Sequence, residues 1–379
     1  MALLLDHCHA IIDCNREYLD ASILIDGGLI KDVFPQTDKI KQSFEDTERI
    51  DLGGCIVMPG SFDTHTHGIL GMNFDEVSKE EMEKISYEFA KSGTTSFLAS
   101  LSYDLSEEGM IRQLSRFEDY ESSYSRFEGF HLEGPFLSPK HLGVGDPKKF
   151  KDVDIEELKR LLDASSKIRQ VTIAYELEGA KKAGELLHDK GIRVMCGHSD
   201  AVLEDLDEKV DGFTHLFNAM RGLHHRDITL VNCAFMNKWQ VELIADGNHV
   251  KENVLKLVLN NIDRDKIMLV SDSSIARGLE DGEYMFLSKP CTKKGTTFIT
   301  FDGHFAGSVV SINDEMKVLY KLGAKYTDLL GYSCYNAFRF YDMEKRFGTI
   351  EKGKYADLLI MDDELNIKDV CLKGGLLHV

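Results

Sequence analysis

The chain lacks a basic segment, a C-x-x-C pair and a long apolar run. Nucleic-acid binding needs a concentration of lysine and arginine, whereas the 379 residues of this chain carry a net charge of -19 at pH 7. No uninterrupted apolar run approaches the roughly 20 residues that cross a bilayer. We therefore expect neither a nucleic acid nor a membrane among its partners. An anionic substrate would have to be held by a few placed residues, because the overall field is repulsive.

The cysteines also exclude a disulfide framework. The chain has 8 of them, scattered without paired spacing, as is typical of buried thiols in a reducing compartment. The N-terminal stretch has no apolar signal region, because it is interrupted by Asp6, His7, His9, Asp13, Arg16 and Glu17. The expected location is the cytoplasm.

Both ends of the chain have the pattern of short β-strands. Two apolar runs within Ala21–Phe34 flank Asp26-Gly27-Gly28, which predicts a hairpin. Near the other end, Ala356–Met361 and Val370–Leu372 are short apolar runs of the same kind. The two ends could therefore pair into one small β-sandwich domain.

The middle of the chain alternates buried-strand and helix patterns. The expected strands are Ser61–His67, Thr94–Ser100, Phe127–Glu133, Val171–Glu176, Arg193–His198, Gly212–Phe217, Val241–Asp246 and Ile267–Asp272. The expected helices include Ser78–Lys91, opened by a capping box of Ser78 and Glu81, and Asp154–Leu162, Lys251–Asn260 and Asn313–Leu322. Eight strand–helix units predict an α/β fold, a (β/α)8 TIM barrel. We expect residues 1–58 and 345–379 to form the small β domain and residues 59–344 the barrel.

Histidine and carboxylate side chains stand at the ends of five expected strands. They are His65, His67, Glu133, His198, His215 and Asp272. Active sites of such barrels lie at the carboxyl ends of the strands. Each residue alone has an ordinary structural explanation, but together they are enough ligands for one or two divalent metal ions. Side chains two apart on a strand share a face, so the first two histidines can clamp one cation. By the same parity His131 faces inward with Glu133, and we expect it to pack in the core or support a ligand.

Several segments resemble the amidohydrolase superfamily. Pro59–Gly68 is similar to its first-strand metal motif, and Gly348–Leu358 to the strand pair that returns to the small domain. Within the superfamily the chain resembles the family of N-acetylglucosamine-6-phosphate deacetylases. The similar segments run in the family's order over nearly the whole chain: His131–Phe136, Gly197–Ala201, Thr214–Met220, Leu223–Arg226, Ile244–His249, Leu269–Asp272 and Ala306–Ser308.

The resemblance implies a role for each residue. Glu133, His198 and His215 would be core metal ligands, and His65 and His67 would hold a second metal. Asp272 would be the general acid and base beside them, while His198 or His215 would help the metal to hold the oxyanion. The residues implied in binding the sugar phosphate are Asn218, the backbone of Ala219, Arg226 and His249, with Arg226, His249 or both reaching in from the neighbouring subunit of a homodimer.

The reaction implied is hydrolysis of the acetamide of N-acetylglucosamine 6-phosphate to glucosamine 6-phosphate and acetate, with Zn or Fe as the metal. One subtype feature and one departure from the family pattern bear on this reaction. Some amidohydrolases bridge their metals with a carbamylated lysine on strand four, but Val171–Glu176 has no lysine, so Glu133 must carry the bridging charge. The family usually has a substrate-contacting histidine where this chain has Gly145.

Other functions stay open at this point. They are deacetylation of a different N-acetyl sugar, deamination, hydrolysis of a cyclic amide, or a non-catalytic role as a sugar-phosphate sensor. Asn218 and the segment His224–Arg226 favour a sugar phosphate over the deamination and cyclic-amide reactions. Asp272 favours an enzyme, because a sensor needs no general acid or base.

Overall fold

Eight parallel strands in the middle of the chain form the sheet that carries the candidate site. The computed structural model describes residues 2–35 and 47–379. The strands lie side by side in chain order: β6 (Ser61–Thr66), β9 (Thr94–Ser102), β10 (Arg126–Glu133), β11 (Ile168–Ile173), β12 (Arg193–Cys196), β13 (Gly212–Phe213), β14 (Gln240–Leu243) and β15 (Ile267–Leu269).

Backbone hydrogen bonds bring the end of this sheet back to its beginning. The N–H of Asp272, beyond β15, donates to the carbonyl of His65 at 2.8 Å, and the N–H of His67 donates to the carbonyl of Ser273 at 2.7 Å. The last strand thus continues beside the first, which confirms the expected eight-stranded barrel architecture.

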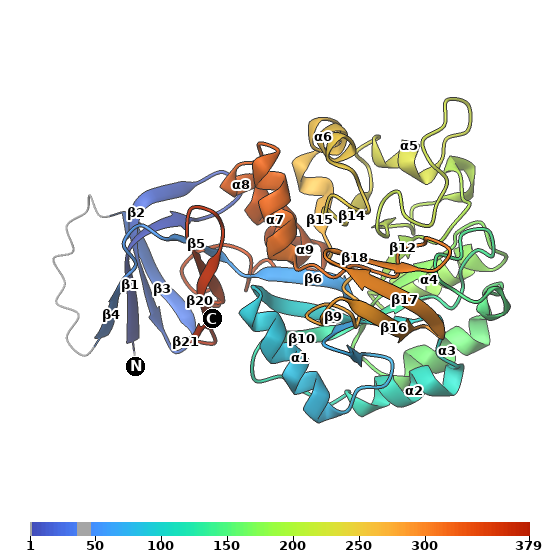
Figure 1. The fold of residues 1–379 in the computed structure, drawn as a ribbon, viewed down its shortest axis with the longest axis horizontal. Helices are drawn as coiled ribbons and strands as arrows, with labels where there is room; N and C mark the ends of the chain where they lie inside the picture. The colour runs from blue at the N-terminus through green and yellow to red at the C-terminus, as the bar shows by residue number, and fades with distance from the viewer. Residues whose placement is uncertain (1, 36–46) are drawn as a thin grey trace.

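Helices connect the strands and cover the outside of the barrel (Figure 1). Those predicted are confirmed within two residues: α1 (Lys79–Lys91), α3 (Ile155–Ala164), α6 (Glu252–Asn261) and α7 (Ile312–Lys321). The capping box of α1 is present, because Ser78 Oγ accepts from the Glu81 N–H at 3.2 Å and the Ser78 N–H donates to Glu81 Oε2 at 2.8 Å. Helices that the pattern did not predict are α2 (Glu107–Arg116), α4 (Ala180–Asp189), α5 (Leu230–Ala234), α8 (Tyr326–Leu330) and α9 (Asn336–Phe340), the last two joined by a π-helical turn over Gly331–Tyr335. Among the described residues, no helix has both the length and the apolar composition for crossing a bilayer.

The two chain ends form a separate β domain at one end of the molecule (Figure 1). Its strands are β1 (Ala2–Ile11), β2 (Glu17–Asp26), β3 (Leu29–Pro35), β4 (Thr47–Asp51), β5 (Ile56–Pro59), β19 (Leu358–Met361), β20 (Ile367–Leu372) and β21 (Gly375–His378). Antiparallel pairing of β5 with β19 joins the two ends, and the predicted β2–β3 hairpin turns at Gly27-Gly28, both with positive φ. Apolar side chains of β1, β2, β5 and β19 gather in one core, so the expected sandwich is a continuous hydrogen-bonded sheet around that core. Residues 1 and 36–46 of the predicted range 1–58 lie outside the described residues.

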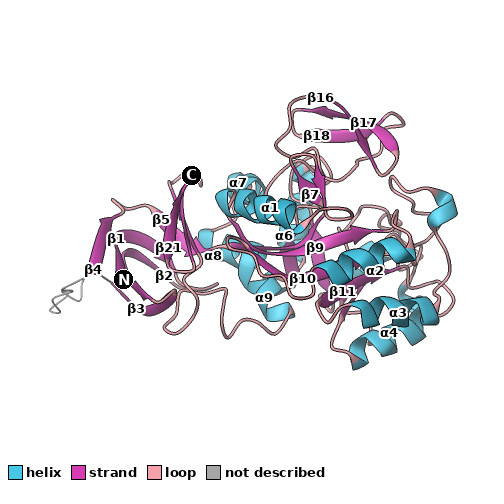
Figure 2. Cartoon of the chain, turned by 90° about the horizontal axis from the view of Figure 1, so that it is seen from below, coloured by secondary structure: helices cyan, strands magenta, loops and turns pink. Residues whose placement is uncertain are grey.

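A small antiparallel sheet stands over the barrel and was not predicted. It consists of β16 (Gly282–Phe286), β17 (Lys289–Lys294) and β18 (Thr297–Thr300), inserted between β15 and α7. Figure 2 shows it apart from the barrel sheet, on the same side as the short strand β7 (Gly68–Ile69), which pairs with β8 (Met72–Asn73). The insertion supplies one wall of the cavity described next.

Candidate active site

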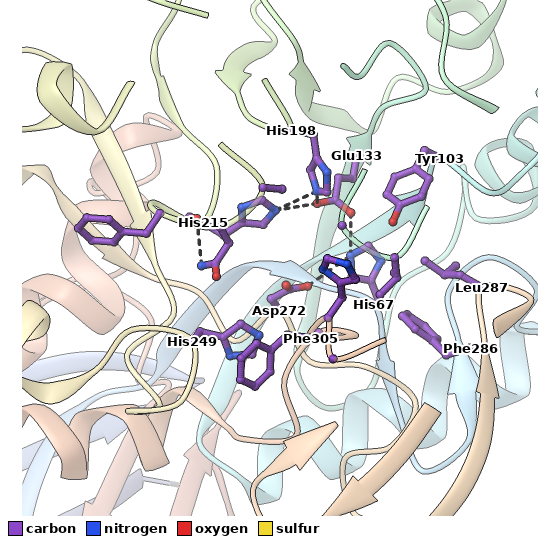
Figure 3. A pocket seen from close by; sticks show the side chains of 18 residues that line it. His67, Tyr103, Glu133, His198, His215, His249, Asp272, Phe286, Leu287 and Phe305 are labelled. Carbon is purple, nitrogen blue, oxygen red and sulfur yellow. Dashed lines mark hydrogen bonds and ion pairs between the residues drawn. The ribbon is translucent and has the colours of Figure 1, made fainter. Parts of the chain in front are cut away.

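Four histidines and two carboxylates from five strands converge at one end of the barrel. His65 lies on β6 and His67 directly after it, while Glu133 ends β10. The other three follow the shorter strands β12, β13 and β15 by two or three residues and are His198, His215 and Asp272. All six predicted ligands are therefore brought together, and Figure 3 shows five of them around one cavity.

Glu133 stands at the centre of the cluster. Its Oε1 lies 3.2 Å from His198 Nε2 and 3.1 Å from His215 Nε2, and its Oε2 lies 3.2 Å from His67 Nε2. The His65 Nε2 atom is 3.4 Å from Oε1. Two groups of three ligand atoms thus share Glu133, one with His65 and His67 and the other with His198 and His215. This arrangement matches the bridging position that the absence of a strand-four lysine predicted for Glu133.

The partners of the histidines fix which nitrogen faces the cluster. His198 Nδ1 lies 2.9 Å from the carbonyl oxygen of His141, and a carbonyl only accepts, so Nδ1 carries the hydrogen. In the neutral ring the Nε2 lone pair then faces a Glu133 oxygen at 3.2 Å, an arrangement that a cation between the two atoms stabilises. His65 is oriented in the same way by Glu242 of β14, whose Oε2 lies 3.3 Å from Nδ1. The donor set therefore fits a divalent metal ion.

The pKa shifts of the cluster residues also favour a bound cation. Burial lowers the pKa of the His65 imidazole, but the carboxylates of Glu133 and Asp272 outweigh burial and raise that pKa well above its ordinary value. The pKa of His67 is likewise raised, because Glu133 outweighs the effect of burial. Burial raises the pKa of Glu133, yet the charge of His65 and the hydrogen bonds with His198, His215 and His65 together outweigh burial and hold that pKa well below the ordinary value. The cluster favours positive charge, which a divalent cation supplies while the imidazoles stay neutral as ligands.

Asp272 lies at the edge of the cluster and faces the cavity (Figure 3). Its Oδ1 is 3.6 Å from His65 Nε2 and 3.5 Å from His67 Nε2. Its side chain is 14% exposed, whereas that of Glu133 is 5% exposed. Asp272 can therefore reach both a ligand atom in the cluster and a molecule in the cavity.

Three site residues have left-handed backbone conformations. The φ angles are 45° for His198, 28° for His215 and 45° for Asp272. Such conformations cost on the order of 1 kcal/mol each in a residue other than glycine. The strands end two or three residues before these positions, earlier than predicted, and the three side chains point into the cluster.

His131 is buried inside the barrel next to the cluster and is not one of its ligands. Its Nδ1 lies 2.9 Å from Ser100 Oγ and its Nε2 2.8 Å from Thr172 Oγ1. Burial, reinforced by the charge of His65, holds the pKa of His131 well below its ordinary value. A neutral ring packed against His65 at 4.5 Å between centroids is the supporting role expected of it.

The cavity beside the cluster has a volume of about 260 Å³ and is lined by three of the four residues predicted to bind the substrate. Asn218, Ala219 and His249 line it. His249 Nδ1 is held by Asp246 Oδ2 at 2.8 Å and its ring packs against Phe305, so Nε2 is the nitrogen left for a ligand. The fourth, Arg226, is exposed on a loop and is not among the lining residues.

Gly145 occupies the position at which the family resemblance predicts a histidine. The neighbouring residues explain why this position carries no side chain. A Cβ atom placed on Gly145 would lie 2.4 Å from Phe150 Cζ and 2.9 Å from the carbonyl oxygen of Leu142. The Phe150 ring therefore occupies the space that a side chain at position 145 needs. His141, nearby, pairs with Asp200 at 3.1 Å.

Apolar and aromatic residues of the cavity were not predicted. They are Tyr103 after β9, Val144, Phe286 and Leu287 at the β16–β17 turn, and Phe305. A tyrosine or phenylalanine near a strand end looks like a core residue in a sequence. Tyr103 directly follows β9, but the strand expected there ended at Ser100, so its position gave no clear signal.

Comparisons with known proteins agree with this geometry. The amidohydrolase family model matches residues 56–377. An N-acetylglucosamine-6-phosphate deacetylase of Bacillus subtilis (strain 168) is 30% identical, over 98% of this chain and 96% of that protein. An N-acetylgalactosamine-6-phosphate deacetylase of Escherichia coli O157:H7 is 28% identical, over 85% of this chain and 87% of that protein.

A solved structure is similar over the whole chain. It is an N-acetyl-D-glucosamine-6-phosphate deacetylase of Mycobacterium smegmatis, an aspartate-to-alanine variant in complex with N-acetyl-D-glucosamine-6-phosphate. It is 25% identical, covers 100% of this chain and 99% of that chain, and has a TM-score of 0.90. With a family match over most of its length and a barrel that carries the ligand cluster, the chain belongs to the amidohydrolase family.

Proposed function

We propose that this protein hydrolyses the acetamide of N-acetylglucosamine 6-phosphate to glucosamine 6-phosphate and acetate. The observation that carries the proposal is the placement of Asp272 between the ligand cluster and a cavity lined by Asn218, Ala219 and His249. An amide held in that cavity meets the cluster and the acid/base group together. The relatives of Bacillus subtilis and Mycobacterium smegmatis, both named for this activity, support the substrate class.

We assign one or two divalent cations, Zn or Fe, to the cluster. Glu133, His198 and His215 would hold one ion, and His65, His67 and Glu133 the other, with Asp272 beside them. When bound, such an ion polarises a carbonyl and lowers the pKa of a water molecule to about 7.

The side chains of the chain carry the proton transfers. Asp272 accepts a proton from the water whose oxygen forms a bond to the acetyl carbon. The same carboxyl group then gives that proton to the amide nitrogen as the C–N bond breaks, so that acetate and the amine leave.

We propose that the phosphate is bound by His249 and by Arg226 of a neighbouring subunit. Arg226 lies on the loop 221–227 with Leu223, which is 60% exposed, so this loop can contact a second copy. The loop is anchored by the Arg221 Nη2–Asp227 Oδ2 contact of 2.6 Å. A guanidinium suits the task because its planar fork donates two hydrogen bonds to a phosphate. The proposed assembly is a homodimer.

A cytoplasmic location is also proposed. It is supported by the eight cysteines, which are free thiols, six of them buried.

The epimer N-acetylgalactosamine 6-phosphate is a second candidate substrate. The Escherichia coli relative named for this sugar is nearly as similar to the chain as the Bacillus subtilis one. The two sugars differ only at the hydroxyl of C4, and Gly145, next to the lining residue Val144, provides no histidine to contact the sugar.

The test is acetate release from both sugar phosphates and from N-acetylglucosamine without phosphate. We expect kcat/KM to be highest for N-acetylglucosamine 6-phosphate and to fall at least about 100-fold without the phosphate, since two charged hydrogen bonds are lost. Higher kcat/KM for the galactosamine epimer would replace the first substrate by the second. Equal rates with and without phosphate would contradict the phosphate assignment.

A further inference from the structure

Tyr103 is held rigidly at the edge of the ligand cluster. It directly follows β9 and is 3% exposed. Its ring packs between those of Phe150 and His198, with centroid distances of 5.2 and 5.6 Å. The backbone of Gly134 approaches so closely that a Cβ there would lie 2.9 Å from Tyr103 Cβ. The ring therefore has little freedom to turn away from the cluster.

The hydroxyl of this buried tyrosine has no partner among the described residues. Tyr103 lines the cavity together with His67 and Glu133. Figure 3 shows its hydroxyl oxygen pointing from the ring toward His67, on the other side of the cluster from His249. A buried tyrosine hydroxyl usually has a hydrogen-bond partner, because leaving it unpaired is unfavourable. The Tyr103 hydroxyl faces the cavity and is therefore available to a group that enters it.

The residues around the Tyr103 hydroxyl indicate which kind of group would bind to it. The phenol of Tyr103 lines the cavity beside Glu133 and Asp272 and, unlike these carboxylates, can donate a hydrogen bond. Such a donor stabilises an oxygen on which negative charge develops.

On this basis, and resting on the proposed function, we propose that Tyr103 is a further catalytic residue, whose hydroxyl donates a hydrogen bond to the acetyl oxygen as the amide carbon becomes tetrahedral. Asp272 then handles the proton at one side of the reacting carbon, and Tyr103 stabilises the oxyanion from the other. No bond to Tyr103 forms or breaks, and its proton stays on the phenol throughout.

The test is Tyr103→Phe, which removes only the hydroxyl and keeps the ring that packs between Phe150 and His198. We expect kcat for N-acetylglucosamine 6-phosphate to fall about 100-fold, as for the loss of one oxyanion donor, while KM changes less than about threefold. Metal content, measured by elemental analysis, should equal that of the wild type. Tyr120→Phe is the matched control, because it removes another buried hydroxyl, bonded to Glu83 at 2.6 Å and far from the cavity. It should leave kcat unchanged.

A binding measurement separates a catalytic role from a structural one. The probe is glucosamine 6-phosphate carrying a methylphosphonyl group on its nitrogen, whose tetrahedral phosphorus bears a charged oxygen where the oxyanion would form. Tyr103→Phe should weaken binding of this probe about 100-fold and leave binding of glucosamine 6-phosphate unchanged. Wild-type kcat in the variant, or equal weakening for both ligands, would overturn the assignment of Tyr103. A wild-type protein that neither releases acetate nor binds the probe would overturn the proposed function, and this inference with it.

Discussion

At the residue scale, the two carboxylates of the cluster have different surroundings and therefore different uses. Glu133 is enclosed by four imidazole nitrogens, whereas Asp272 opens to the cavity with a side chain that is 14% exposed. A carboxylate that can exchange protons with a bound molecule needs the second environment.

We predict that Asp272→Asn lowers kcat by at least about 1,000-fold, because the amide cannot take or return a proton. Metal content should stay near that of the wild type, since the Asn oxygen remains a possible ligand and five other ligands are intact. Asp328→Asn is the control, because its side chain has a similar exposure of 15% but pairs with Arg264. Normal turnover by Asp272→Asn would remove this residue from the mechanism.

Glu242 is a positioning residue that the sequence did not reveal. Its Oε2 faces His65 Nδ1 at 3.3 Å and its Oε1 accepts from Gln170 Nε2 at 2.9 Å, all within the buried interior. A carboxylate that holds a ligand histidine fixes the ring and makes its other nitrogen more basic.

We predict that Glu242→Gln weakens metal binding about 10-fold, measured by competition with a chromophoric chelator. Glu157→Gln is the control, since Glu157 is also buried but lies on α3 and pairs with Lys151. Equal metal affinity in wild type and Glu242→Gln would show that His65 does not need this contact.

At the scale of the elements, the sequence predicted the repeated strands and helices but not where each strand ends. A run such as Gly212–Phe217 looks extended, yet β13 ends at Phe213, and His215 within the run adopts a φ of 28°. A histidine in a sequence does not indicate a left-handed backbone conformation. The site residues were still predicted, because histidine and carboxylates stand out at the ends of apolar runs. Tyr103 and Glu242 did not stand out in the sequence. An aromatic residue there resembles a residue of the hydrophobic core, and the role of a carboxylate within a strand becomes clear only when its contacts are known.

Burial of Glu315 on α7 makes the stability of the folded barrel depend on pH. Its Oε1 accepts from the Ala245 N–H at 3.1 Å, and its Oε2 has no partner among the described residues. Burial raises its pKa well above the ordinary 4.5, and the charges of Asp246 and Asp63 raise it further. Below pH 4.5 the group is protonated in both states. Above it the unfolded chain ionises first, so unfolding becomes easier as pH rises toward the folded-state pKa.

We predict that Glu315→Gln removes this loss of folding stability at higher pH. The free energy of unfolding of the variant should exceed that of the wild type by a margin that grows with pH, on the order of 1 kcal/mol per pH unit above about pH 5. Urea unfolding of the metal-loaded proteins at several pH values measures the margin. A difference that is the same at pH 5 and pH 8 would contradict the raised pKa.

At the scale of the whole molecule, one of the two residues that we propose as phosphate ligands lies outside the cavity of its own chain. His249 lines the cavity, whereas Arg226 is exposed outside it. A twofold dimer would let the loop 221–227 of each copy complete the cavity of the other.

We predict that two inactive variants complement each other. In a mixed dimer of Arg226→Ala and Asp272→Asn, one cavity combines the intact Asp272 of one copy with the intact Arg226 of the other. Random exchange of an equal mixture makes half of the dimers mixed, with one intact site in each, so about a quarter of the wild-type activity should return. No recovery in a mixture shown to have exchanged subunits would place Arg226 in its own copy's site or outside it.

The most direct test of the account is acetate release from N-acetylglucosamine 6-phosphate by the purified protein, before chelation, after chelation, and after Zn or Fe is restored. The account predicts release that chelation abolishes and metal restores, because the cluster around Glu133 needs a divalent ion to act. Release that survives complete removal of metal, or none from metal-loaded protein, would contradict it.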